Sequence, residues 1–303
     1  MVSDVFPTVS VIIPTHNRSQ LLKRAIGSVL NQTYSKLECI VVDDASTDET
    51  TEVVASFNDD RIRGFRHKIN RHASAARNTG IKYSQGEYIG FLDDDDEWMP
   101  DKLKQQVDLL NISSPNIGLV YCWMSYIANG VMQKIYTPKL KGYIFKEMLD
   151  KQAIGNSSTL LVRKKVIDEI GCFDESLPRG NDGDFIRRVC RKYEVDFIPE
   201  VLVKVYTDHG NHRISDNNEA DIRNAIMSQE HKLQKFEDEL QSMTYIKATI
   251  YSIIGTHYVE LGAWMKAIKK YCIALSINPK IIRLIMPEFI KNIKNSLFKF
   301  IKY

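Results

Sequence analysis

Residues 89–100, IGFLDDDDEWMP, place four consecutive aspartates directly after a short apolar run. The apolar residues predict a buried strand, so Asp93, Asp94, Asp95 and Asp96 would lie at its carboxyl end. Grouped carboxylates repel one another unless a cation lies against them. The stretch therefore raises the question of which cation these four side chains bind.

Strand-like and helix-like segments alternate around this stretch. The predicted strands are residues 9–13, 37–44, 62–67 and 87–92, and the predicted helices are 19–30, 48–57 and 73–86. The alternation predicts an α/β fold with a mainly parallel sheet flanked by helices. Ligands of such sheets bind beyond the carboxyl ends of the strands. Polar clusters at 14–18, 43–46 and 93–96 follow three of these strands, and we expect them to converge on one crevice.

The pattern changes after residue 111. Strand-like residues 118–127, 158–164 and 196–206, with helical segments between them, predict a mixed continuation of the same domain. From about residue 216 the pattern is helical throughout. We therefore expect an α/β domain over residues 1–215 and a helical C-terminal region over residues 216–303.

Composition narrows the classes of protein to consider. The 303 residues carry a formal net charge of only +3, which does not indicate a nucleic-acid-binding protein. The five cysteines are scattered and lack metal-binding spacing, so we expect reduced thiols and a cytoplasmic location. No basic segment precedes the first apolar run, so no signal peptide is expected, and no run is long enough to span a membrane.

The last segment, residues 281–303, carries five basic residues against one acid, Glu288. Its apolar residues recur at helical spacing, so a basic amphipathic tail is expected. Such a tail suits an anionic membrane surface, or it packs on the catalytic domain or on a second subunit.

The aspartate string has the chemistry of a metal site. Carboxylates are hard oxygen donors suited to Mg²⁺, Mn²⁺ or Ca²⁺, but the ~12-residue spacing of a calcium loop is absent. Magnesium or manganese is usually bound by one or two carboxylates together with phosphate oxygens. The string therefore suggests a metal that bridges to a diphosphate, and the alternative is a solvated acidic loop that caps the next helix.

Five ordered motifs carry a resemblance to a known family. They are VSVIIPTHNR, IVVDDASTDET, ASAARNTGI, GEYIGFLDDDDEW and NDGDF, and they cover roughly residues 7–215. Together they resemble the inverting family 2 glycosyltransferases of the GT-A fold. The resemblance implies a Rossmann-like α/β domain that binds a nucleoside-diphosphate sugar with Mn²⁺ or Mg²⁺. It also implies transfer of the sugar to a hydroxyl of a glycan or lipid-linked acceptor, in surface polysaccharide synthesis at the inner face of a membrane.

By this resemblance, nine residues form the donor site, with Asp44 accepting a hydrogen bond from the base. They are Pro14, Thr15, His16, Asn17, Arg18, Asp44, Arg77, Asp93 and Asp94. Two of them have plainer alternatives, since His16 could be a surface loop histidine and Arg77 an exposed helix arginine. Asp43 is expected to hold the adjacent turn, and Trp98 either packs under a sugar or belongs to the core.

The resemblance makes Asp95 the metal ligand, with an uncertainty of one residue in the register. His209 is the second candidate ligand, and His212 is its alternative. The family often has Arg where Thr207 stands, so that phosphate contact is either missing here or supplied by Lys204 or Arg213.

The resemblance places the catalytic base at Asp182, in the motif NDGDF. The family usually has Glu-Asp here, whereas this chain has Asn181 followed by Asp182. Asn cannot take up the proton of an acceptor hydroxyl, which favours Asp182. Asp184 is the rival, and its alternative role is that of a carboxylate in the first turn of a helix.

Two other functions remain open from the residues alone. One is a nucleotidyltransferase, which also uses paired aspartates on an α/β sheet. The other is a non-catalytic module that binds a nucleotide sugar or a glycan.

Overall fold

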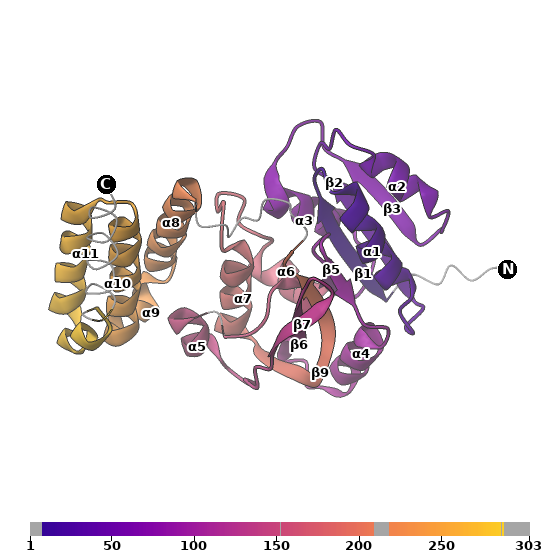
Figure 1. Cartoon of the computed structure of the whole chain (residues 1–303). Coiled ribbons are helices and arrows are strands. Elements are labelled where there is room, and N and C mark those ends of the chain that lie inside the picture. Colours follow the sequence, from indigo (N-terminus) through magenta and orange to yellow (C-terminus); the bar gives the residue numbers. More distant parts are fainter. Residues whose placement is uncertain (1–7, 152, 209–217, 286, 288–303) are drawn as a thin grey trace. The chain divides into compact units, whose positions relative to one another are not determined.

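The computed structural model describes residues 8–151, 153–208, 218–285 and 287 (Figure 1). The chain divides into two compact units: Met1–Ser176 with Asn181–Gly210, and Leu177–Gly180 with Asn211–Tyr303. The predicted boundary after residue 215 falls in residues 209–217, which lie outside the described residues, as do His209, His212 and Arg213.

The first unit is built on one mixed sheet. Its strands are β1 (Val9–Thr15), β2 (Leu37–Asp43), β3 (Ile62–Arg66), β4 (Tyr88–Phe91), β5 (Asp96–Trp98), β6 (Ile117–Ala128), β7 (Val131–Tyr136), β8 (Leu161–Arg163) and β9 (Glu194–Tyr206). They run in the order β3-β2-β1-β4-β8-β6-β9-β5, with β7 paired to β6. The longer ladders are parallel, whereas β5, β7 and β8 pair antiparallel with their neighbours. The predicted α/β fold with a mainly parallel sheet is confirmed.

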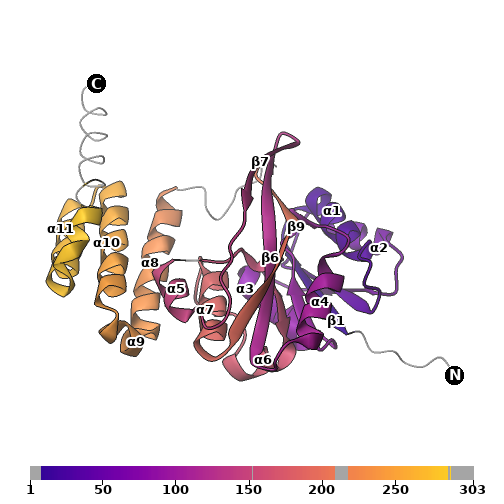
Figure 2. The same ribbon diagram turned by 90° about the horizontal axis from the view of Figure 1, so that it is seen from below.

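Helices cover both faces of this sheet. They are α1 (Ser19–Leu30), α2 (Thr50–Ser56), α3 (His72–Tyr83), α4 (Lys102–Ile112), α5 (Phe145–Asp150), α6 (Lys164–Ile170) and α7 (Asn181–Lys192), with a 3₁₀ turn η1 (Ser157–Thr159). Figure 2 shows α1, α2 and α4 on one side of the sheet and α3, α5 and α7 on the other. Alternation along β1 explains the two layers, because Val11 and Ile13 pack with α1 while Ile12 packs with α3 and α7.

The strand order creates a switch point between β1 and β4. From β1 the chain proceeds to β2 on one side and later returns to β4 on the other. Helix α3, which connects β3 to β4, packs very close to β1, since a Cβ on Gly80 would lie 2.4 Å from Ile12 Cγ2. The loops after β1 and β4 and one face of α3 are thereby brought to a single edge, the place where α/β sheets bind ligands.

The start of α1 is held by a side chain from another loop. Ser19 is the first helical residue, and Arg18 occupies the cap position without a side-chain hydrogen bond to the helix. Ser19 N instead donates to Asp48 Oδ2 at 2.9 Å, so a carboxylate from the loop after β2 satisfies this helix end.

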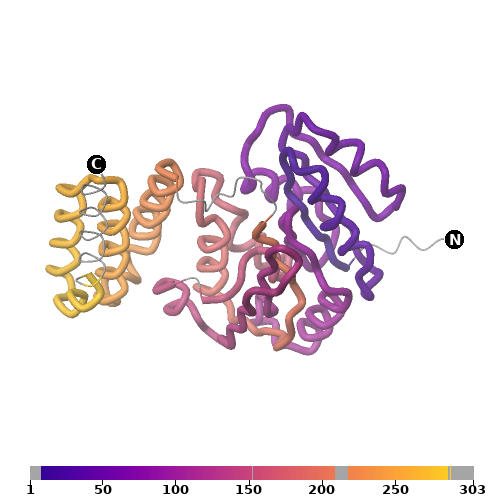
Figure 3. Tube along the Cα trace, viewed as in Figure 1, coloured from indigo at the N-terminus to yellow at the C-terminus, as the bar shows by residue number. Residues whose placement is uncertain are grey.

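The second unit is helical, as predicted. It contains α8 (Glu219–Lys235), α9 (Glu237–Ser242), α10 (Thr244–Glu260), α11 (Trp264–Ile277) and the 3₁₀ turn η2 (Pro279–Ile281). Figure 3 traces α10 and α11 side by side, and a short connection through Gly262 joins them. Within the ranges that the structure describes, none of the helices is long and apolar enough to cross a bilayer.

Candidate functional site

The loop after β1 is held to the loop after β2. Asn17 has a φ of 53°, a left-handed backbone that Asn tolerates better than most residues. Its backbone N–H donates to Ser46 Oγ at 2.9 Å, and its side-chain oxygen accepts from Thr47 N at 2.7 Å. His16 is exposed, whereas Pro14 and Thr15 are buried at the end of β1. The first predicted motif is therefore an ordered loop at the sheet edge, in which the exposed His16 imidazole lies 3.2 Å, Nε2 to Nδ2, from the Asn17 side chain.

Arg18 is the first cation that lies on the aspartate string. Its Nη1 donates to Asp94 Oδ1 at 3.0 Å and to Asp95 Oδ2 at 3.2 Å. Burial raises the pKa of Asp94 to about 6, and the nearby Arg18 guanidinium opposes that rise. Arg24 Nη2 also donates to the Asp95 carbonyl oxygen at 2.6 Å, which fixes the backbone of the string.

Arg77 is the second cation on the string. It is buried on α3, so the alternative of an exposed helix arginine is wrong. Its Nη2 donates to Asp93 Oδ1 at 2.6 Å, and its Nη1 lies 3.4 Å from Asn181 Oδ1 at the start of α7. The guanidinium also lies 5.3 Å from the centre of the Phe173 ring. Arg77 thus joins the end of β4 to the beginning of α7.

Asp96 has a different environment from the other three aspartates. It opens β5, which pairs antiparallel with β9, and it is 1% exposed. Its Oδ2 accepts from Ser158 Oγ at 2.6 Å and from Asn156 Nδ2 at 3.2 Å, while no described residue donates a hydrogen bond to Oδ1. Burial and the neighbouring carboxylates raise its pKa well above the usual value. Asp96 is therefore a buried structural acid, and the alternative of a solvated acidic loop is wrong for this residue.

The residues Asn156, Ser157 and Ser158 support the string, and no sequence motif marks them. Ser157 Oγ lies 3.2 Å from Asp93 Oδ1, and Asp93 N donates to Ser158 Oγ at 3.1 Å. Ser158 thus joins the Asp93 backbone to the Asp96 carboxyl group. Ser157 and Ser158 can be identified as site residues only from the fold, which brings their hydroxyl groups to the end of β4.

Asp44 is buried beside two groups that the sequence did not single out. His67 Nδ1 lies 2.7 Å from Asp44 Oδ1, and Arg71 N donates to both carboxylate oxygens at 2.9 and 3.0 Å. The other imidazole nitrogen of His67 contacts Thr79 Oγ1 at 2.8 Å. The Asp44 carboxylate is therefore fixed in orientation at the end of β2. Its neighbour Asp43 accepts from Ser46 N at 2.8 Å, so it does hold the turn, as predicted.

The two acids of the motif NDGDF occupy different environments in the first turn of α7. Asp184 is 1% exposed and its Oδ2 lies 2.9 Å from Arg188 Nε, one helical turn away. This ion pair matches the structural role considered for Asp184. Asp182 is half-buried, and its Oδ1 accepts from Gly183 N at 2.7 Å. Asn181 contacts Arg77 on one side and Ser74 Oγ, at 3.0 Å, on the other, which holds the start of α7 against α3.

Some candidates have structural roles. Trp98 is 2% exposed, and its Nε1 donates to the Ser158 carbonyl at 2.8 Å, so it belongs to the core. Lys204 Nζ lies 2.9 Å from Glu97 Oε1, and Thr207 Oγ1 donates to the Ile127 carbonyl.

The carboxylates of the aspartate string suit a metal ion whose coordination shell is completed by other ligands. In the portion of the chain that is described, no three His, Cys, Asp or Glu side chains are grouped to hold a metal ion. The carboxylates of Asp93 and Asp95 are nevertheless hard oxygen donors that follow β4 at this edge of the sheet. Because Mg²⁺ and Mn²⁺ usually take one or two carboxylates and complete their shell with phosphate oxygens, these residues fit such a metal.

Several known proteins are similar to this chain in sequence. An uncharacterized glycosyltransferase of Rickettsia prowazekii is 34% identical over 204 residues, covering 65% of this chain and 63% of that protein. The Escherichia coli UDP-Glc:alpha-D-GlcNAc-diphosphoundecaprenol beta-1,3-glucosyltransferase WfgD is 35% identical over 156 residues, covering 51% of this chain and 60% of that one. The chain thus spans less than two thirds of the length of these relatives.

Two solved structures share the fold at low sequence identity. Residues 1–349 of TarS from S. aureus, in complex with UDP-GlcNAc, match with a TM-score of 0.64 and 17% identity, covering 90% of this chain and 92% of that one. The mannosyltransferase PcManGT from Pyrobaculum calidifontis, in complex with GDP-Man and Mn2+, matches with a TM-score of 0.59 and 20% identity, covering 97% and 88%. These likenesses identify the architecture as the GT-A fold.

Residues 10–171, more than half of the chain, match the sequence model of the family described as Glycosyl transferase family 2. This range holds the loop after β1, the aspartate string and the serines of η1. On this evidence the chain belongs to glycosyl transferase family 2.

Proposed function

We propose that this chain is an inverting glycosyltransferase that moves a sugar from a nucleoside-diphosphate sugar to a hydroxyl of a glycan or lipid-linked acceptor. The observation that carries the proposal is the pair of guanidinium groups, Arg18 and Arg77, that lie on Asp93, Asp94 and Asp95 at the switch point. Guanidinium groups match phosphate oxygens in geometry and charge, so the same crevice offers donors for a diphosphate.

The donor is proposed to lie along the edge formed by β2, β1 and β4. Asp44, fixed by His67 and Arg71, would accept an N–H of the base, and residues 14–18 would line the nucleotide pocket. A UDP-linked sugar is favoured because the E. coli relative is named for UDP-Glc and TarS was solved with UDP-GlcNAc.

Asp95 is the proposed ligand for Mn²⁺ or Mg²⁺, with His209 as the second. The metal would neutralise charge on the departing diphosphate, and PcManGT was solved with Mn2+. Arg18 and Arg77 would hold the phosphate oxygens, and Asp93 and Asp94 would position both arginines.

Asp182 is the proposed base. As the acceptor oxygen attacks the anomeric carbon, Asp182 takes up the hydroxyl proton and the diphosphate leaves with the electron pair of the broken C–O bond. The contact between Asn181 and Arg77 ties the turn that carries Asp182 to the residues around Asp93. A positioned base typically contributes about 10²–10⁴-fold to the rate.

The acceptor is proposed to be a growing glycan on a lipid carrier, in surface polysaccharide synthesis, because WfgD is named for such an acceptor. We therefore also propose a cytoplasmic location at the inner face of a membrane. The basic residues of the 281–303 segment would attract anionic lipids, or the segment would join two copies of the chain.

One assay separates the candidate functions. The purified protein is incubated with Mn²⁺ and a panel of UDP-, GDP- and dTDP-sugars. Release of nucleoside diphosphate that depends on the sugar supports glycosyl transfer. Turnover of pyrophosphate would instead indicate nucleotidyl transfer, and tight donor binding without turnover would indicate a binding module.

A further inference from the structure

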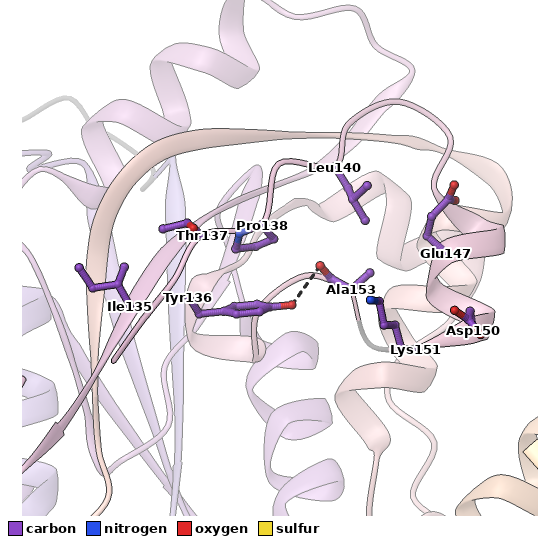
Figure 4. A pocket seen from close by; sticks show the side chains of 9 residues that line it. All are labelled: Ile135, Tyr136, Thr137, Pro138, Leu140, Glu147, Asp150, Lys151 and Ala153. Atoms are coloured by element: carbon purple, nitrogen blue, oxygen red, sulfur yellow. Dashed lines mark hydrogen bonds between the residues drawn. The ribbon is translucent and has the colours of Figure 1, made fainter. Parts of the chain in front are cut away.

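A groove of about 540 Å³ lies in the first unit, between the end of β7 and α5. It is lined by Ile135, Tyr136, Thr137, Pro138, Leu140, Glu147, Asp150, Lys151 and Ala153. Figure 4 shows the Tyr136 ring extending from β7 toward Ala153, with the charged side chains on and after α5. None of the site residues that were predicted from the sequence lines this groove.

Three aromatic side chains fix the walls of the groove. Trp123 Nε1 donates to the Pro138 carbonyl at 2.8 Å, and Tyr121 Oη donates to the Leu140 carbonyl at 2.7 Å. Tyr136 Oη donates to the Ala153 carbonyl at 3.2 Å. The polar ends of these rings are used to hold loops, which leaves the Tyr136 ring face in a defined orientation. The groove is therefore formed before any ligand arrives.

The lining has the chemistry that sugars require. A sugar ring presents apolar C–H groups on its faces and hydroxyl groups around its rim. Tyr136, Pro138 and Leu140 offer an apolar surface, while Glu147 and Lys151 offer an acceptor and donors for hydroxyls. In the described ranges, no side-chain hydrogen bond or ion pair is found for Glu147, Asp150 or Lys151.

The groove adjoins the proposed site of transfer along the chain and along β6. Ala153 lies in the groove wall, and Ser157, four residues later, contacts Asp93. Four residues span at most about 14 Å. On β6, Tyr136 pairs with Met124, and Leu161, just after η1, pairs with Val120. The groove wall therefore lies within about 14 Å, measured along the chain, of a residue that contacts Asp93.

We propose that this groove binds a sugar unit of the acceptor glycan, at least one unit away from the hydroxyl that reacts. The inference rests on the proposed function and deepens it, because it makes the acceptor an oligosaccharide chain that is recognised beyond its reacting end. Tyr136 stacks on the sugar ring, and Glu147 and Lys151 bind its hydroxyls.

The test uses the full chain and two measurements. Saturation-transfer NMR with free di- and trisaccharides measures glycan binding without any turnover, and donor hydrolysis by water measures the donor site without any acceptor. The variants are Tyr136→Ala, Tyr136→Phe and Lys151→Ala. Tyr143→Ala and Lys146→Ala are the matched controls, since Tyr143 and Lys146 are exposed nearby but do not line the groove.

We expect Tyr136→Ala to weaken saccharide binding about tenfold, and Lys151→Ala to weaken it less, while donor hydrolysis stays unchanged. Tyr136→Phe keeps the ring and should retain most of the binding, and Asp182→Asn should retain it fully. Should Tyr136→Ala fail to fold, Lys151→Ala against Lys146→Ala decides.

The groove proposal would be overturned if the Tyr136 and Lys151 variants bound saccharides as tightly as the wild type. It would also be overturned if the wild-type chain bound no saccharide. If the wild-type chain binds saccharides but does not hydrolyse any donor, that result would count against the proposed function alone. The two failures are therefore distinguishable.

Discussion

Arg77 Nη2 lies 2.6 Å from Asp93 Oδ1, and the two side chains come from different elements, α3 and the loop after β4. The Arg77 side chain is 7% exposed and that of Asp93 is 28% exposed, so the pair lies at the boundary between the core and the surface. Because the same guanidinium reaches Asn181, Arg77 connects the loop after β4 with the helix that carries Asp182.

Arg77→Lys tests this connection. A lysine keeps the charge but cannot contact Asp93, Ser157 and Asn181 together, because it lacks the planar fork of the guanidinium. We expect donor affinity to fall about tenfold or more and turnover to fall with it. The measurement is donor binding by calorimetry alongside turnover. Arg71→Lys is the control, since the Arg71 side chain is 48% exposed and pairs with Glu175 at the surface. Equal effects of the two changes would contradict the role of Arg77.

Asp182→Asn separates binding from chemistry. Asn is nearly isosteric but cannot take up a proton, so we expect turnover to fall about 10²–10⁴-fold with donor affinity retained. Asp184→Asn is the comparison, because it breaks the buried pair with Arg188 and should lower the melting temperature instead. Turnover close to that of the wild type in Asp182→Asn would remove this residue as the base.

Asp95→Ala tests the proposed metal ligand. Removing this carboxylate should abolish the part of donor affinity that depends on Mn²⁺, and affinity without metal should change little. Calorimetry of donor binding with and without Mn²⁺ gives both values. Asp101→Ala is the control, since Asp101 is exposed after the string and contacts Thr33. The assignment of Asp95 would be wrong if Mn²⁺ still increased donor affinity to the same extent.

Ser158→Ala tests the support under the aspartate string. The change removes the bond to Asp96 Oδ2 and the acceptor for Asp93 N, while the Ser158 carbonyl still accepts from Trp98 Nε1. We expect the apparent KM for donor and the Mn²⁺ requirement to rise several-fold, at a stability cost of about 1–3 kcal/mol. Ser158→Thr, which restores a hydroxyl, should recover part of both. A change in melting temperature alone would indicate a purely structural residue.

The layout of the first unit could be predicted because its strands and helices carry clear periodicity. The β-branched run at β1 and the apolar face of α1 identify both elements, and the strand ends then identify the crevice. The segments β5 and β7 were missed for physical reasons. Strand β5 has only three residues, and β7 is exposed along most of its length, so neither shows an alternating pattern.

The contacts of the site were less predictable than its members. The sequence motifs identify Arg18, Arg77 and the aspartates as candidate site residues. They do not show which carboxylate each arginine contacts, because that depends on packing between α3, β1 and β4. Ser158 and His67 act through contacts across long sequence separations, and no local pattern marks them. Burial distinguishes members of the string that the sequence leaves alike, since Asp96 enters β5 while Asp93 stays partly exposed.

We expect the substitution Lys102→Met to stabilise the fold by an amount that depends on pH. Lys102 is 0% exposed, its Nζ lies 3.8 Å from the centre of the Trp98 ring, and it donates to Gln106 Oε1 at 2.7 Å. Burial lowers its pKa from 10.5 to about 8. Between these values the unfolded chain binds more protons than the folded one, so the free energy of unfolding rises with pH, by about 3 kcal/mol in total.

The variant Lys102→Met fills the same space without a charge, so it should unfold at a higher temperature than the wild type at pH 7. Its advantage should shrink as pH rises from 8 toward 10.5, because the wild-type lysine becomes neutral in the fold. Thermal unfolding of both proteins across this range gives the comparison. Lys104→Met, at an exposed position on the same helix, should show no such convergence. Parallel pH profiles for wild type and Lys102→Met would mean that the buried amine does not titrate in this range. The core beside Trp98 would then carry its charge at no cost to the fold.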